Sequence, residues 1–187
     1  MGTRIGQTSS TSGEPSFPGK LAFVNDDLRA LYTWVKGSRD RLFAWADTLP
    51  PDLYTFEHPD FAFGSLRNIH AHVAQCYLLW VGVRGLNLEL ERYRQATEAS
   101  SLADVPAMRA AFHEVDNVLE LAFERFTELD APLDVEFRAR PLQVTRRWLL
   151  MHPVTHEFHH KGQMLALGRV LGHPYPPGPD TDLVLPF

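Results

Sequence analysis

The sequence predicts an all-α protein, a four-helix bundle with a long crossover between its second and third helices. Four segments carry apolar residues at the three- and four-residue steps of amphipathic helices. Capping residues, glycines and prolines separate these segments, and a length of 187 residues suits one domain. We therefore expect a flexible tail over residues 1–20, the bundle over 21–172 and a proline-rich tail over 173–187.

The first two helices are expected on either side of a loop rich in prolines and aromatic residues. The first begins with Asn25 as its N-cap and ends before Pro50. The second follows the N-cap Ser65 and ends at Gly85. Its apolar stripe includes a histidine, His72, which we expect to point into the core.

The last two helices are expected after the crossover of residues 86–103. The third covers about 104–130, and the fourth runs from the N-cap Thr145 to Leu171. Gly172 then stands where a helix commonly ends in the left-handed conformation.

Two stretches leave alternatives open. Residues 133–144 alternate apolar and polar side chains, which suits either a short hairpin or a loop. Pro153 lies within the fourth helix, where it removes a hydrogen-bond donor. It predicts a kink or a break there, unless the regular helix starts at Pro153 with His152 near its cap.

Composition excludes several classes of protein. Eighteen basic against twenty-three acidic residues give a net charge of -5, so nucleic acid is a poor partner. The single cysteine, Cys76, forms no internal disulfide, which points to the reducing cytoplasm. The sequence shows no secretory signal and no apolar run long enough to span a membrane, so we expect no membrane contact.

The fourth helix carries four of the nine histidines, within nine residues. His156 and His160 are four residues apart, so their imidazoles stack one turn above each other and can hold one metal ion. His152 shares their face, and His159 lies at its margin. Such a run favours a metal site over its alternative, a solvated or pH-sensing face.

A third ligand must come from another helix, and His72 is the candidate. His70 is rotated away from it and should face outward. Cys76, one turn after His72, is a fourth ligand or, more often for such a residue, a packed core thiol. Glu157 lies off the ligand face and is expected in solvent. The sequence singles out no catalytic residue.

These residues carry a resemblance. The segment HPVTHEFHHKGQ and the segment SLRNIHAHVAQCYLLW resemble the last and second helices of the DinB/YfiT-like superfamily. The resemblance implies a metal-binding four-helix bundle, usually dimeric, with His72, His156 and His160 as ligands. Lys161 replaces the commoner arginine, Pro153 lies within the helix, and no acidic residue soon follows His72, which leaves the substrate subclass open.

The predicted function is that of a divalent-metal protein, favouring an enzyme that acts on a small molecule. Known relatives imply a thiol-dependent S-transferase with a low-molecular-weight thiol as one substrate. A metal-dependent hydrolase and a non-catalytic stress-response protein are the alternatives. Zinc is the expected ion, with nickel or iron as alternatives, and a homodimer is the expected assembly.

Overall fold

The computed structural model describes residues 19–176 and is mostly helical, with one small two-stranded sheet. In chain order the elements are α1 (Gly19–Ala46), α2 (Leu66–Tyr77), the π-helical η1 (Leu78–Gly85), α3 (Leu90–Ala96), the 3₁₀ turn η2 (Ala99–Ser101), α4 (Val105–Arg125), β1 (Pro132–Phe137), β2 (Arg140–Thr145) and α5 (Arg146–Val170).

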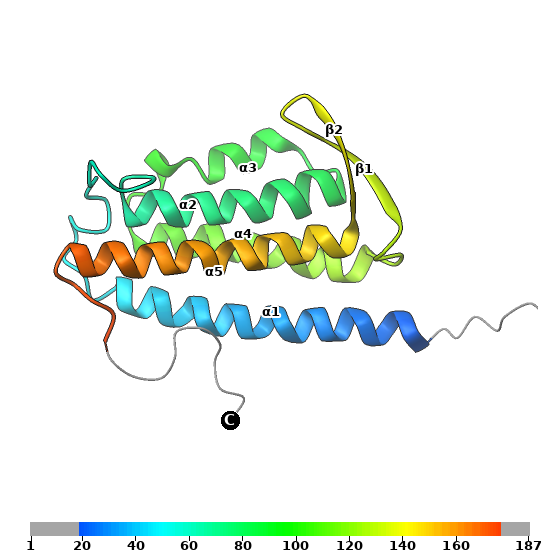
Figure 1. Ribbon diagram of the computed structural model, residues 1–187, viewed down its shortest axis with the longest axis horizontal. Helices are drawn as coiled ribbons and strands as arrows, with labels where there is room; N and C mark the ends of the chain where they lie inside the picture. The colour runs from blue at the N-terminus through cyan, green and yellow to red at the C-terminus, as the bar shows by residue number, and fades with distance from the viewer. Residues whose placement is uncertain (1–18, 177–187) are drawn as a thin grey trace, which may run out of the picture.

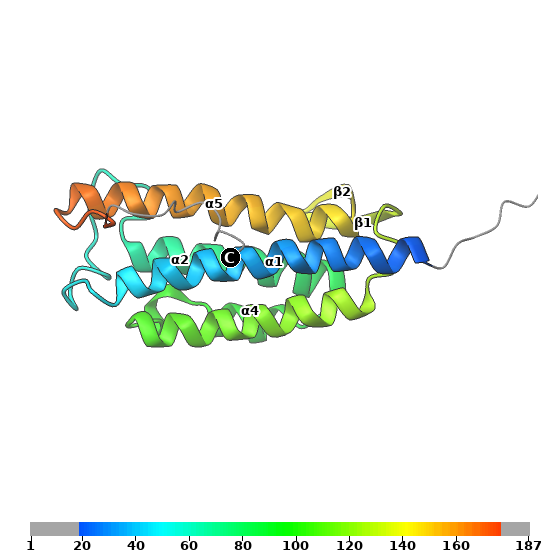
Figure 2. The same cartoon turned by 90° about the horizontal axis from the view of Figure 1, so that it is seen from below.

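The long helices lie side by side along one axis, with α2 continuing into η1 (Figures 1 and 2). α5 packs against α2 and runs in the opposite direction, as the colours of Figure 1 show. α3 lies outside α2 within the crossover, and the hairpin β1–β2 extends beside the first turns of α5 (Figure 1). The main core forms where α1, α2, η1, α4 and α5 meet.

The predicted N-caps Ser65 and Thr145 are confirmed, because each side chain accepts a hydrogen bond from the backbone N–H three residues on. Asp104, at the expected start of the third helix, caps α4 in the same way. α5 ends where it was expected, and Gly172 has a φ of 81°. α1 instead begins at Gly19, so Asn25 lies inside it and is no cap.

Two further expectations need correction. α5 continues through Pro153 without a break. The fold is not wholly α-helical, because β1 and β2 pair as an antiparallel hairpin with Phe137 opposite Arg140. Its two turn residues, Arg138 and Ala139, have φ values of 53° and 58°, the conformation of a tight primed turn.

The expected tails fall mostly outside the described residues, since 1–18 and 177–187 are not described. Within residues 19–176, no helix has the length and apolar character needed to span a membrane.

Candidate metal centre

Three histidines meet where α2 faces α5. The turn of α2 that carries His72 lies beside the turns of α5 that carry His156 and His160. Nε2 of His156 lies 2.9 Å from Nε2 of His72 and 3.1 Å from Nε2 of His160. The structure therefore brings together the three residues that the sequence singled out.

The cluster has the dimensions of a metal site. Nitrogens that lie about 2.1 Å from one ion are about 3.0 Å apart at a right angle and about 3.4 Å apart at the tetrahedral angle. The separations of 2.9 and 3.1 Å in the cluster match the right-angle value. The three rings could hold a metal ion, and all their ligand atoms lie within 4.8 Å of one another.

The surroundings keep these imidazoles neutral, which is the form that binds metal. Burial is the main cause that lowers the pKa of His156 to about 4, and the neighbouring histidines add to it. Burial likewise lowers the pKa of His72 and of His160. Protonation of two of the rings would place like charges about 3 Å apart, so the cluster resists protonation and keeps its lone pairs available for a metal ion.

A side-chain amide orients one ring of the cluster. Oε1 of Gln163 lies 2.7 Å from Nδ1 of His160, and Nε2 of Gln163 lies 3.1 Å from Nε2 of His159. Because an amide oxygen only accepts, Nδ1 of His160 carries the proton, and its Nε2 lone pair points at the cluster. His159 is exposed, and its ring also meets the ring of His160 edge-on at 4.9 Å between centroids. The sequence indicates this contact only through the three-residue spacing of His160 and Gln163, which places both side chains on the same face of the helix.

An aromatic ring from the preceding loop covers the cluster. Phe63 stacks on His72 at 4.5 Å between ring centroids and meets His160 edge-on at 5.3 Å. Its φ of 66° is rare for a bulky residue. The carbonyl oxygen of Phe63 accepts a hydrogen bond of 2.8 Å from the Asn68 side chain, which holds the loop in place. Sequence reasoning did not find this residue.

A second group of potential ligands lies one turn along both helices. Cys76, His152 and His156 bring one ligand atom each within 4.8 Å. The thiol is buried in a small apolar cluster with Trp80 and Leu149, and this burial raises its pKa to about 12. Cys76 therefore packs as a neutral core thiol. The ring of His152 stacks on Trp148 with an interplanar angle of 9°.

The cluster borders a cavity of about 600 Å³. His72, His156 and His152 line one side of the cavity, and Trp80, Trp148 and the tip of the hairpin line much of the remainder. Such a volume is in the range of small-molecule sites. A ligand in the cavity would lie directly beside the histidines.

Three residues in or near the cluster lie elsewhere than expected. His70 does not face outward, because it is 2 % exposed in the core, with its Nδ1 2.8 Å from the hydroxyl of Tyr54. His72 is instead half-buried at the groove between α2 and α5. Glu157 is not in solvent, because it is buried between α5 and α1.

Glu157 belongs to a buried ion pair that holds α5 against its neighbours. Nε and Nη2 of Arg39 donate to the two carboxylate oxygens of Glu157 at 2.8 and 2.9 Å. The Tyr77 hydroxyl donates to Oε2 of Glu157 at 2.7 Å, and Nη1 of Arg39 reaches Asp116 at 3.1 Å. The network joins α1, α2, α4 and α5, and it fixes the rotation of α5 that points the adjacent His156 into the groove.

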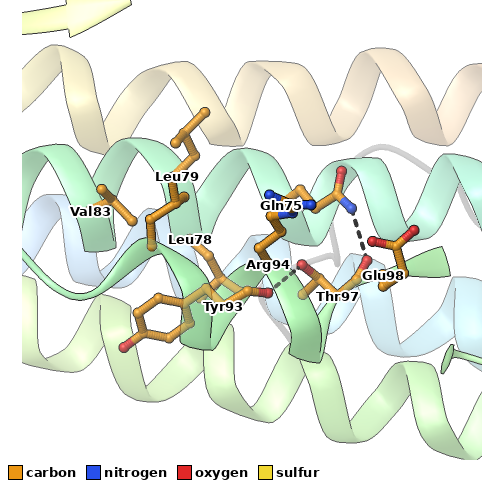
Figure 3. Close-up of a pocket in the computed structure, with 9 residues that line it drawn as sticks. Gln75, Leu78, Leu79, Val83, Tyr93, Arg94, Thr97 and Glu98 are labelled. Carbon is orange, nitrogen blue, oxygen red and sulfur yellow. Dashed lines mark hydrogen bonds between the residues drawn. The ribbon is translucent and has the colours of Figure 1, made fainter.

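A smaller hollow of about 310 Å³ lies between α2, η1 and α3 and shares Gln75 and Leu79 with the larger cavity (Figure 3). Gln75 crosses it and donates a hydrogen bond of 2.8 Å to the carbonyl oxygen of Thr97. Arg94 and Glu98 place opposite charges at its edge, and no member of the histidine cluster lines it. The metal-site chemistry therefore belongs to the larger cavity.

Comparison with known proteins agrees with the geometry. Among curated proteins, none matches the chain significantly. The profile of the DinB family matches residues 23–183, most of the chain, including all three histidines of the cluster. The chain therefore belongs to the DinB family.

Proposed function

We propose that the protein binds a divalent metal ion through His72, His156 and His160, and that it uses this ion to act on a small molecule. The observation that carries the proposal is the convergence of three neutral Nε2 atoms at the wall of a cavity of about 600 Å³. We further propose that the long helices form the bundle expected from the sequence.

The favoured reaction is transfer of a small electrophile to a low-molecular-weight thiol. The thiol sulfur forms a bond to an electrophilic carbon, the leaving group departs with its electron pair, and the thiol proton passes to solvent. A bound divalent ion supplies Lewis acidity, which lowers the pKa of a thiol or a water molecule. The chain contributes the apolar walls of Trp80 and Trp148, which bind the substrate and exclude water.

Elemental analysis of purified variants tests the metal site. We expect His72→Ala, His156→Ala and His160→Ala each to lose stoichiometric metal. His113→Ala is the matched control, because His113 is exposed on α4 and outside the cluster, and it should keep the full metal content. Full metal content in His72→Ala would refute the site.

Thiol consumption tests the reaction. The metal-loaded and the metal-free protein are each given a low-molecular-weight thiol and a chloronitrobenzene electrophile, and chloride release is followed. We expect release only with metal and only in proportion to thiol. Release of substrate groups without thiol consumption would instead support a hydrolase, and no turnover with any electrophile would support the non-catalytic alternative.

A further inference from the structure

Away from the histidines, the walls of the cavity are mainly aromatic and aliphatic. Trp80 and Trp148 meet edge to face at 5.0 Å, and Phe137 packs on Trp80 at 5.0 Å. Leu79 and Leu142 complete the apolar lining. Aromatic rings that pack edge to face favour another aromatic ring in the same site.

The charge around the cavity has one sign. Of the described residues that line it, Arg138 is permanently charged, and none carries a carboxylate. Arg138 is exposed at the tip of the hairpin, and within the described residues it forms no ion pair. Its guanidinium lies 5.2 Å from the ring of Phe137, so its charge is held next to an apolar wall.

The turn of the hairpin holds the backbone of Arg138 in an unfavourable conformation. Both turn positions are left-handed, and such turns normally use asparagine and glycine. Arginine in this conformation is strained, and strained residues cluster at binding sites. The turn therefore aims the base of this long side chain in a defined direction.

We infer that the cavity binds an aromatic molecule with a single anionic group, whose ring lies against the tryptophans and whose carboxylate pairs with Arg138. This inference rests on the proposed function, since it takes the cavity to be the substrate site of that reaction. It narrows the second substrate of that reaction, the electrophile, to the class of aromatic carboxylates.

Titration calorimetry with three matched probes tests the inference. The probes are 4-phenylbutyrate, 4-phenylbutanol and 4-phenylbutylamine, which share one apolar body and differ in charge. We expect the carboxylate to bind most tightly and the amine most weakly, in the metal-free as well as the metal-loaded protein. Arg138→Gln should weaken the carboxylate about fivefold, the size of an exposed ion pair, and leave the alcohol unchanged.

Charge reversal and a neighbouring control sharpen the test. Arg138→Glu should reverse the order, so that the amine binds more tightly than the carboxylate. Arg140→Gln removes a charge from the same hairpin outside the cavity lining and should change none of the three affinities. Equal affinities of the three probes, or equal effects of both arginine variants, would overturn the inference.

The metal-free arm separates this inference from the proposed function. A carboxylate preference that appears only with metal and ignores Arg138 would overturn the inference and leave the metal site standing. A preference that depends on Arg138 in a protein that binds no metal would support the inference and refute the proposed metal centre.

Discussion

Gln163 shows how a single residue prepares a histidine for metal. Its amide oxygen accepts from Nδ1 of His160, while its amide nitrogen donates to His159. Replacing the amide by an apolar side chain would remove the acceptor for Nδ1 of His160. The orientation of the ring and the nitrogen that carries its proton would then no longer be fixed. Partners of this kind are worth about 10- to 100-fold in metal affinity.

We therefore expect Gln163→Leu to weaken zinc binding about 10- to 100-fold. Competition with a chromophoric chelator measures the dissociation constant. Gln163→Glu keeps an acceptor for Nδ1 and should restore most of the affinity. A loss of the same size in both variants would show that the contact with Nδ1 of His160 does not orient the ring.

His70 is the residue whose titration should be visible in the stability of the fold. Its Nε2 is the buried side-chain atom without a hydrogen-bond partner among the described residues. Burial, together with the positive charges of Arg39 and Arg109, lowers the pKa of His70 to about 3. The folded protein thus keeps this ring neutral, while the unfolded chain takes up a proton below about pH 6.5.

The sign of the effect follows from this difference. The contribution of His70 is complete above about pH 6.5 and is lost as the pH falls towards 3. The free energy of unfolding should drop by about 2 kcal/mol between pH 8 and pH 5 from this group alone. Urea unfolding with a chelator present should show that extra drop in the wild type and not in His70→Asn. Equal drops in both proteins would contradict the buried, neutral state.

At the scale of elements, the buried ion pair decides how α5 sits against α1. Arg39 is 4 % exposed and Glu157 is 7 % exposed, and the pair is bidentate. Removing one partner of such a pair leaves an uncompensated charge in the core. The position of His156 depends on this contact, because it precedes Glu157 directly on the helix.

We expect Glu157→Gln to lower the free energy of unfolding by about 3 kcal/mol or more. Urea unfolding at neutral pH measures the change. Glu124→Gln, on the exposed face of α4, is the matched control and should alter the stability by less than about 0.5 kcal/mol. A change of that small size in Glu157→Gln would mean that the pair adds nothing to the packing of α5.

For the whole molecule, the size of the core indicates that the stability of the fold does not depend on the metal ion. The core runs through all the long helices, and large side chains such as Tyr77, Phe43 and Leu149 are at most 2 % exposed. A core of this extent needs no metal ion to hold it, in contrast to a zinc finger. The ion is therefore expected to serve function more than folding.

Removal of metal with a chelator at neutral pH should leave the far-ultraviolet circular dichroism spectrum nearly unchanged. Returning zinc at a hundredfold excess over its dissociation constant should raise the free energy of unfolding by about 2.7 kcal/mol. Loss of helix in step with metal release would show that the ion is a structural metal required for folding. It would also remove the main argument for a metal centre with an open coordination position.

By itself, the sequence determined the features that depend on near neighbours in the chain. The four-residue step from His156 to His160 places both rings on one face, because an α-helix repeats every 3.6 residues. The caps Ser65, Asp104 and Thr145 were readable for the same reason, since a cap bonds three residues ahead. His72, two helices away, was the candidate third ligand because it lies in the apolar stripe of the second helix, and the family resemblance implied the same residue.

Only the tertiary structure decided which face of α2 turns to the core and which to the groove. α2 contacts both α4 and α5, so periodicity alone did not distinguish His70 from His72. Glu157 is buried because its partner, Arg39, lies 118 residues away in the chain. The hairpin that carries Arg138 lacks the usual turn residues, and it forms because its apolar face, which includes Val144, packs on Trp80 and Leu149. Such pairings depend on which surfaces meet when the helices assemble, and local sequence does not encode that.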